Sequence, residues 1–150
     1  MKMKQMTKEE FDQYISEAVM HYAKEKIKVG NWTEEEAYLK AKEEYESLLP
    51  NREETPNHYL FTLLEKDERV GMIWFTKSTP KLGFICEISI IEAYQGKGYG
   101  QEAMKQIEIF AKSIGIEKIE LHVFGGNERA INLYEKLGYK MTNIRMAKLI

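Results

Sequence analysis

A run of alternating glycines at residues 94–100 (Tyr-Gln-Gly-Lys-Gly-Tyr-Gly) constrains the fold more than any other part of the chain. It follows an apolar, strand-like segment at residues 84–91 and precedes a segment whose apolar residues have helical spacing. Glycine adopts backbone conformations that other residues avoid and lets a ligand approach the main chain closely. Consecutive backbone N–H groups at a helix N-terminus attract anions, above all phosphate. The sequence therefore predicts a strand–turn–helix unit that binds a phosphorylated ligand.

The composition is typical of a single globular domain. The chain has 150 residues, of which 43% are hydrophobic and 31% charged, enough to bury a core, so we expect one domain over residues 1–150. The net charge of −2 gives no electrostatic reason to expect nucleic acid as a partner. No apolar run approaches the roughly 20 residues that span a bilayer, and residues 1–8 lack an apolar signal core. We therefore expect no membrane association and a cytoplasmic location.

Two capping boxes, at residues 7–10 and 33–36, mark the starts of two helices in the first third of the chain. Gly30 suits the end of the first helix, and Pro50 ends the second. The apolar stripe of the second helix is expected to be Tyr38, Ala41, Tyr45 and Leu48.

Strand patterns dominate from residue 58 onward. Residues 59–64 and 70–76 are rich in aromatic and branched side chains and predict a hairpin. We expect further strands at residues 2–6, 84–91 and 119–124, a helix between the last two that makes them parallel, a helix over 127–137, and one bent strand or two short ones over 139–150. The predicted fold class is α/β (α+β), with a mixed central sheet of about six to seven strands and about four helices.

Two motifs carry a family resemblance. Gln95-x-x-Gly98-x-Gly100 matches the pattern [RQ]-x-x-G-x-[GA], and residues 127–139 match N-x-x-A-x-x-x-Y-x-K-x-G-[FY]. The glycine spacing fits neither the dinucleotide fingerprint nor the Walker P-loop. The two motifs together resemble the GNAT superfamily of acetyl-CoA-dependent N-acetyltransferases, in particular its small bacterial members. The resemblance is specific from about Glu87 to Tyr139 and implies the GNAT fold over essentially the whole chain.

The resemblance implies acetyl-CoA as co-substrate. Backbone N–H groups of residues 95–100 would bind its pyrophosphate, although Gln95 stands where many relatives carry Arg. The strand segment 88–90 would bond the pantetheine arm through its main chain, and the N–H near Ile88 would polarise the thioester carbonyl. The implied cofactor-binding residues are Ile88, Ser89, Ile90, Gln95, Gly96, Lys97, Gly98, Tyr99, Gly100, Gln101, Asn127 and Tyr134.

Acetyl transfer to an amine needs a general base, because only the unprotonated amine attacks a thioester. We choose Glu87, since it interrupts an apolar strand beside the implied thioester position, where burial would make a carboxylate a better base. A structural carboxylate at this position is nearly as good an interpretation. His122 and a water chain are alternatives, and Glu92 looks solvated. The resemblance gives Tyr134 the role of proton donor to the leaving thiolate.

The remaining candidates carry weaker signals. Cys86 is the only cysteine and is expected to be a buried, inert thiol. His21 and His58 carry no positional signal, and no Cys/His cluster has metal-ligand spacing, so we predict no metal. Trp32 and Trp74 are possible aromatic walls of an acceptor site, but packing explains them equally well.

The amine acceptor is not identified by the sequence beyond a small molecule or a peptide. Acidic runs at residues 34–36 and 43–46 would attract a cation, but such runs are more often the solvated face of a helix. Exposed terminal strands would make a homodimer reasonable. The competing function is a non-catalytic acyl-CoA-binding sensor or scaffold, which would bind acetyl-CoA without releasing thiol in the presence of amines.

Overall fold

The structure is a computed structural model that describes residues 1–150. The chain divides into two compact units, Met1–Glu120 and Leu121–Ile150, which are described one at a time. The first unit contains β1 (Lys2–Gln5), α1 (Lys8–Lys28), α2 (Glu34–Leu48), β2 (His58–Glu65), β3 (Glu68–Lys77), β4 (Leu82–Ile90), α3 (Tyr99–Ser113) and most of β5 (Lys118–Leu121), with short 3₁₀ turns η1 (Arg52–Glu54) and η2 (Glu92–Tyr94).

The strands form one sheet in the order β1–β2–β3–β4–β5. The first three pairings are antiparallel. Lys66 and Asp67, with φ of 50° and 66°, form the two-residue turn between β2 and β3, as expected where both central residues need positive φ. Neighbouring strands β4 and β5 are joined through helix α3, the crossover that parallel neighbours need. The sheet is therefore mixed, as predicted.

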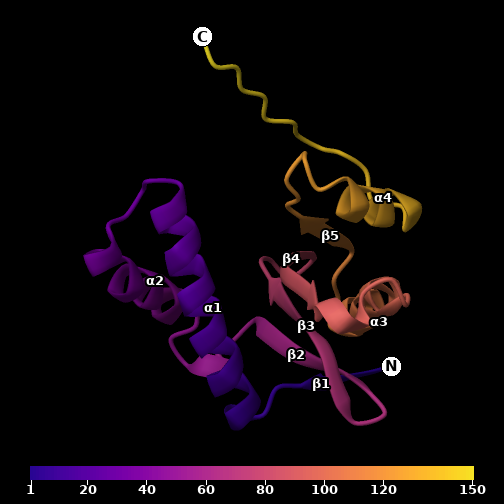
Figure 1. The fold of residues 1–150 in the computed structure, drawn as a ribbon. Helices are drawn as coiled ribbons and strands as arrows, with labels where there is room; N and C mark the ends of the chain where they lie inside the picture. The colour runs from indigo at the N-terminus through magenta and orange to yellow at the C-terminus, as the bar shows by residue number, and fades with distance from the viewer. The chain divides into compact units, whose positions relative to one another are not determined.

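Helices cover both faces of this sheet (Figure 1). Trp74 and the residue after it, Phe75, point to opposite faces because side chains alternate along a strand. Phe75 meets the ring of Phe110 from α3 at a centroid distance of 6.2 Å, so α3 covers the face opposite Trp74. The face of Trp74 carries a buried cluster with α1 and the end of α2, made of Met6, Phe11, Tyr14, Leu49, Leu60, Met72 and Trp74.

The two N-terminal helices begin where the capping boxes predict. Glu10 N–H donates to Thr7 Oγ1 at 3.1 Å, and Thr33 N–H donates to the Glu36 carboxylate at 3.1 Å. The predicted stripe of α2 is wrong in part, because Tyr38 and Leu48 are exposed while Ala37 is buried. The physical reason is that α2 packs closely on α1, where small side chains meet: Val19, Ala23, Ala37 and Ala41 form one buried cluster.

The second unit contains α4 (Glu128–Lys136). Gly138 follows it with φ of 97°, as a helix C-terminus favours. Residues 139–150 form no strand, so the expected sixth and seventh strands are wrong and the sheet has five strands. Apolar residues in this segment stand at 139, 141, 144, 146, 147, 149 and 150, with polar residues among them on both alternating faces, so neither face of a strand would be uniformly apolar. The homodimer expectation, which depended on these strands, stays a prediction without that support.

No helix of the structure is long and apolar enough to cross a membrane.

Candidate active site

The turn between β4 and α3 has the backbone shape that its glycines predict. Gly96 and Gly98 adopt φ of 75° and 85°, and Gly98 is the left-handed residue at which α3 begins. A side chain costs about 1 kcal/mol or more in this region of backbone space. A Cβ atom built on Gly98 would meet nothing within 4 Å, so space there is open toward solvent or a ligand.

Contacts on both sides hold this turn in place. The Tyr94 hydroxyl donates to Glu68 of β3 at 2.7 Å, and the Gln95 side-chain amide donates to the Ile90 carbonyl at 2.9 Å. At the end of β4, a Cβ on Gly71 would lie 2.2 Å from the Ser89 carbonyl oxygen. Only glycine at residue 71 permits this close approach of β3 to β4. The turn is therefore fixed to the rest of the sheet.

The N–H groups of this turn have no partner within the protein. Those of Gly96, Lys97 and Gly98 donate to no backbone or side-chain acceptor, and those of Tyr99 to Gln101 belong to the first turn of a helix, where no intrahelical acceptor exists. The Lys97 ammonium lies 5.4 Å from the centre of the Tyr94 ring. Free N–H groups at the start of a 15-residue helix, beside one cation, fit a diphosphate.

The last residues of β4 are bonded to β3 on one side. Ile88, Ser89 and Ile90 pair with Ile73, Met72 and Gly71. On the other side, the N–H of Lys118 at the start of β5 donates to the Lys81 carbonyl at 3.2 Å. Because β5 has only four residues, it ends before the level of Ile88. β5 thus leaves the main chain of residues 88–90 unpaired on that edge, where an extended ligand could add, except that the Ile90 carbonyl already accepts from the Gln95 side chain.

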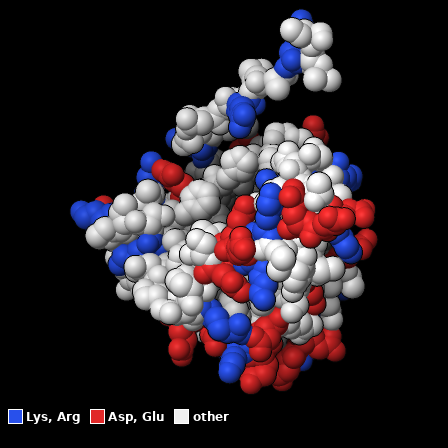
Figure 2. All heavy atoms as spheres, turned by 90° about the vertical axis from the view of Figure 1, so that its left-hand side faces the viewer, with Lys and Arg blue, Asp and Glu red and all other residues white.

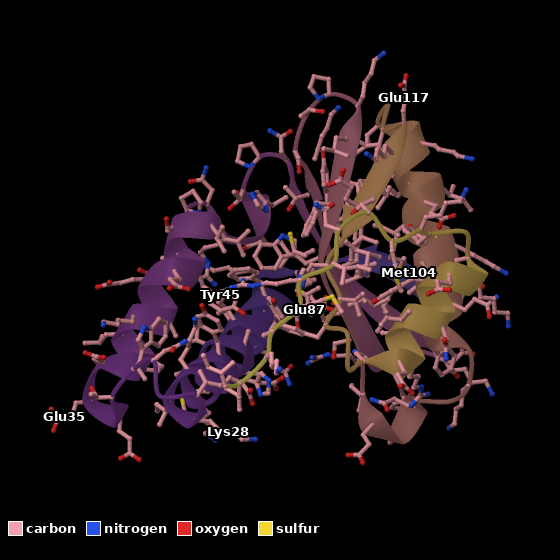
Figure 3. All side chains as sticks on the ribbon, turned by 90° about the horizontal axis from the view of Figure 1, so that it is seen from above. Lys28, Glu35, Tyr45, Glu87, Met104 and Glu117 are labelled. Carbon is pink, nitrogen blue, oxygen red and sulfur yellow. The ribbon has the colours of Figure 1, made fainter.

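Glu87 lies at an irregularity of β4. Trp74 pairs with Glu87 while Phe75 pairs with Ile85, which leaves Cys86 as the extra residue of a β-bulge. Glu87 shares the face of its cross-strand partner Trp74, the face covered by α1 and α2. Its side chain is half-buried, and Figure 3 shows Glu87 and Tyr45 between the helices and the sheet.

Two tyrosines surround the Glu87 carboxylate. The Tyr14 hydroxyl donates to Glu87 Oε2 at 2.6 Å. Burial, followed by the charge and hydrogen bond of Glu87, holds the pKa of Tyr14 far above its usual value. Burial and the nearby Glu87 charge raise the pKa of Tyr45 to about 12. Both hydroxyls are therefore protonated throughout the physiological pH range. The sequence offered no signal for either contact, since Tyr14 and Tyr45 look like ordinary core positions of two helices.

A second polar network lies on the same face. Trp74 Nε1–H donates to His58 Nδ1 at 3.1 Å, and Thr76 Oγ1 lies 3.0 Å from the same nitrogen and 3.1 Å from Cys86 Sγ. Burial lowers the pKa of His58. The expectation of a buried thiol is wrong, because the bulge leaves Cys86 exposed. Trp74 is only 5% exposed, so it belongs to the core and does not form the wall of a site.

The acidic runs on α2 are paired with neighbouring side chains. Lys40 pairs with Glu36 at 3.4 Å, and the Tyr22 hydroxyl donates to Glu44 at 2.6 Å. Trp32 packs edge-on against Tyr22 at 5.5 Å. Figure 2 shows acidic and basic side chains interspersed on the face that it displays. This arrangement is that of a solvated helix surface and singles out no cation site.

In the second unit, Asn127 caps α4, since its side-chain oxygen accepts from the Ala130 N–H at 3.2 Å. Tyr134 lies on the same helix, with its ring 6.1 Å from that of Tyr139. Burial raises the pKa of the Tyr134 hydroxyl, which keeps its proton available. His122 follows the end of β5 and contacts Phe124 at 5.1 Å. The roles of Asn127, Tyr134 and His122 stay predictions.

Glu92 lies in η2, just past β4, and is exposed. No group of three or more His, Cys, Asp or Glu side chains could hold a metal ion.

Comparison with known proteins defines the class. The family model of the Acetyltransferase (GNAT) family matches residues 17–139. The chain is 39% identical to the uncharacterized N-acetyltransferase YdgE of Bacillus subtilis, over 97% of this chain and 96% of that protein. The crystal structure of the putative acetyltransferase YycN from Bacillus subtilis superposes with a TM-score of 0.84 at 38% identity, covering 99% of this chain and 98% of that one.

A more distant relative is named for its substrates. The spermine/spermidine N(1)-acetyltransferase of Bacillus subtilis is 30% identical over 82 residues, which cover 54% of this chain and 47% of that protein. The family match and the full-length relatives together establish that this chain belongs to the GNAT family of N-acetyltransferases.

Proposed function

We propose that this chain transfers an acetyl group from acetyl-CoA to a primary amine, by direct attack of the amine on the thioester. The observation that carries this proposal is the pair of features on β4: a half-buried carboxylate at Glu87 and a row of free backbone N–H groups directly after the strand ends. Acyl transfer from a phosphorylated carrier needs both a base and an anion site.

The free N–H groups of residues 96–101 would hold the pyrophosphate of the donor, with Lys97 adding a positive charge nearby. The available edge at Ile88–Ile90 would hold its extended arm by main-chain hydrogen bonds. Acetyl-CoA supplies an activated acetyl group as a thioester. An N–H donor near Ile88 would stabilise the negative charge that develops on the carbonyl oxygen.

Glu87 would accept the proton of the attacking amine, directly or through one water. The new bond joins nitrogen to the acetyl carbon, and the carbon–sulfur bond breaks. Tyr134 would donate its proton to the departing sulfur; burial raises the pKa of its hydroxyl, so the group is protonated before transfer. His122 is the alternative base, and Glu92 is a weaker one because it is exposed.

We also propose that the two units act as one catalytic domain. The family model runs continuously from residue 17 to 139 and so crosses the boundary at Glu120. The second motif of the family, which contains Asn127 and Tyr134, belongs to the second unit. The proposed domain therefore spans both units.

The acceptor class is an amine on a small molecule or a peptide. One relative is named as a spermine/spermidine N(1)-acetyltransferase, which supports polyamines as the first compounds to test. The decisive experiment incubates the chain with acetyl-CoA and polyamines, amino acids, aminoglycosides or peptides, and measures free thiol. We expect amine-dependent thiol release. Calorimetric binding of acetyl-CoA without thiol release across the whole panel would contradict the proposal and favour a sensor.

A further inference from the structure

Tyr14 is the only side chain that bonds the Glu87 carboxylate. Its hydroxyl donates to Oε2 at 2.6 Å, a length typical of a strong hydrogen bond to a charged acceptor. No protein group donates to Oε1. The two carboxylate oxygens therefore differ: one is held by the protein and the other is free to accept a proton.

The position of Tyr14 is rigid. It is 4% exposed and packs in the cluster between α1 and the sheet, with the Phe11 ring at 6.4 Å. Burial is the first cause of the raised pKa of its hydroxyl, so Tyr14 is protonated and can donate at physiological pH. A buried donor on a helix thus fixes a carboxylate on the bulge of β4.

We infer that Tyr14 is a positioning residue for the general base: its hydroxyl holds Glu87 Oε2, so that Oε1 faces the amine. This inference depends on the proposed function.

The other titratable groups that face Glu87 provide a matched control. They are Tyr45 from α2 and Cys86, its neighbour on β4; the partner from β3, Trp74, is uncharged. The Glu87 charge interacts electrostatically with the Tyr45 hydroxyl, but Tyr45 makes no hydrogen bond to Glu87. Tyr14→Phe and Tyr45→Phe therefore remove the same atom beside the same carboxylate, and only Tyr14→Phe removes a hydrogen bond.

The test uses the full chain with ¹³C-labelled glutamate, with the Glu87 carboxyl resonance assigned by its loss in Glu87→Gln. In Tyr14→Phe, we expect the chemical shift of this resonance to differ from that in the parent, and by more than in Tyr45→Phe, because only Tyr14→Phe removes a hydrogen bond from the carboxylate. With acetyl-CoA and spermidine as probes, kcat should fall about tenfold, as loss of one charged hydrogen bond implies, while KM for acetyl-CoA is unchanged.

An unchanged chemical shift of the Glu87 carboxyl in Tyr14→Phe, with Glu87→Gln inactive, would overturn the role of Tyr14 and leave the proposed function intact. Full activity of Glu87→Gln would instead overturn Glu87 as base, and with it both statements.

Discussion

The two ends of the candidate site are built in different ways. The turn offers main-chain N–H groups from residues 96–101, whereas the N–H of Gln95, which was predicted to join them, donates to the Glu92 carbonyl at 3.1 Å. The side chains of the turn serve mainly to hold it, as Tyr94 does through Glu68. The Glu87 region offers a side chain, and its geometry depends on a hydroxyl from a helix 73 residues away in the sequence. Backbone groups need only a local conformation, whereas a side-chain base needs tertiary packing.

This difference determines how each region should respond to change. A backbone site should be sensitive to backbone conformation and to added negative charge, and insensitive to pH. A side-chain site should be sensitive to single-atom substitutions and to pH. The four predictions below test that contrast, from the largest expected effect to the smallest.

Glu87→Gln should lower kcat about a thousandfold, within the range for loss of a general base, because an amide cannot accept the amine proton. Affinity for coenzyme A should be unchanged, since the turn is not altered. Steady-state kinetics and calorimetry measure the two quantities. Glu92→Gln, on the exposed η2 turn, is the matched control and should retain kcat; the reverse pattern would assign the base to Glu92.

Gly98→Asp should weaken binding of coenzyme A by about 100-fold or more, because a carboxylate would stand among the groups that hold phosphate. Gly30→Asp is the matched control: Gly30 has φ of 78°, and a Cβ there also meets nothing within 4 Å. Both variants carry similar backbone strain. If calorimetry shows that both lose the same affinity for coenzyme A, the placement of the pyrophosphate at this turn is refuted.

Tyr134→Phe should lower kcat about tenfold and leave the affinity for acetyl-CoA nearly unchanged, because it removes a proton donor and little contact area. Initial-rate kinetics measure kcat and the KM for acetyl-CoA separately, so that the change in each can be compared. An unchanged kcat would show that the leaving sulfur receives its proton from another group. The contrast between the turn and the Glu87 region does not depend on Tyr134.

The smallest effect concerns His58. Burial lowers the pKa of His58 in the folded protein below the ordinary histidine pKa of about 6.5. The neutral side chain therefore stabilises the folded state at pH values above about 6.5. This stabilisation is lost as the pH falls through the lowered pKa of the folded protein. The urea concentration at the unfolding midpoint should therefore decrease when the pH is lowered from 7.5 to 5.5. The decrease should be smaller in His58→Gln. His21→Gln, at an exposed position on α1, should behave like the parent; an equal pH response in all three proteins would contradict this.

The sequence predicts the regions whose conformation is local. The capping boxes at Thr7 and Thr33, the glycines at 96 and 98 and the Asn127 cap all act within a few residues, and the structure confirms each of these elements. The same holds for the hairpin of β2 and β3.

The sequence does not predict what depends on packing at a distance. Nothing near Tyr14 in the chain indicates that it bonds Glu87, and nothing near Cys86 indicates a bulge that exposes it. Residues 139–150 are predicted as one bent strand or two short ones, but a strand forms only where a neighbour pairs with its backbone, and no such pairing occurs.

The most direct test of the central claim is an amide NMR titration of the ¹⁵N-labelled chain with coenzyme A. If main-chain N–H groups after β4 bind the pyrophosphate, the amide resonances of Gly96 to Gln101 will shift more than any others, and inorganic pyrophosphate will shift the same set. Saturable binding of coenzyme A that leaves these resonances in place would contradict the account.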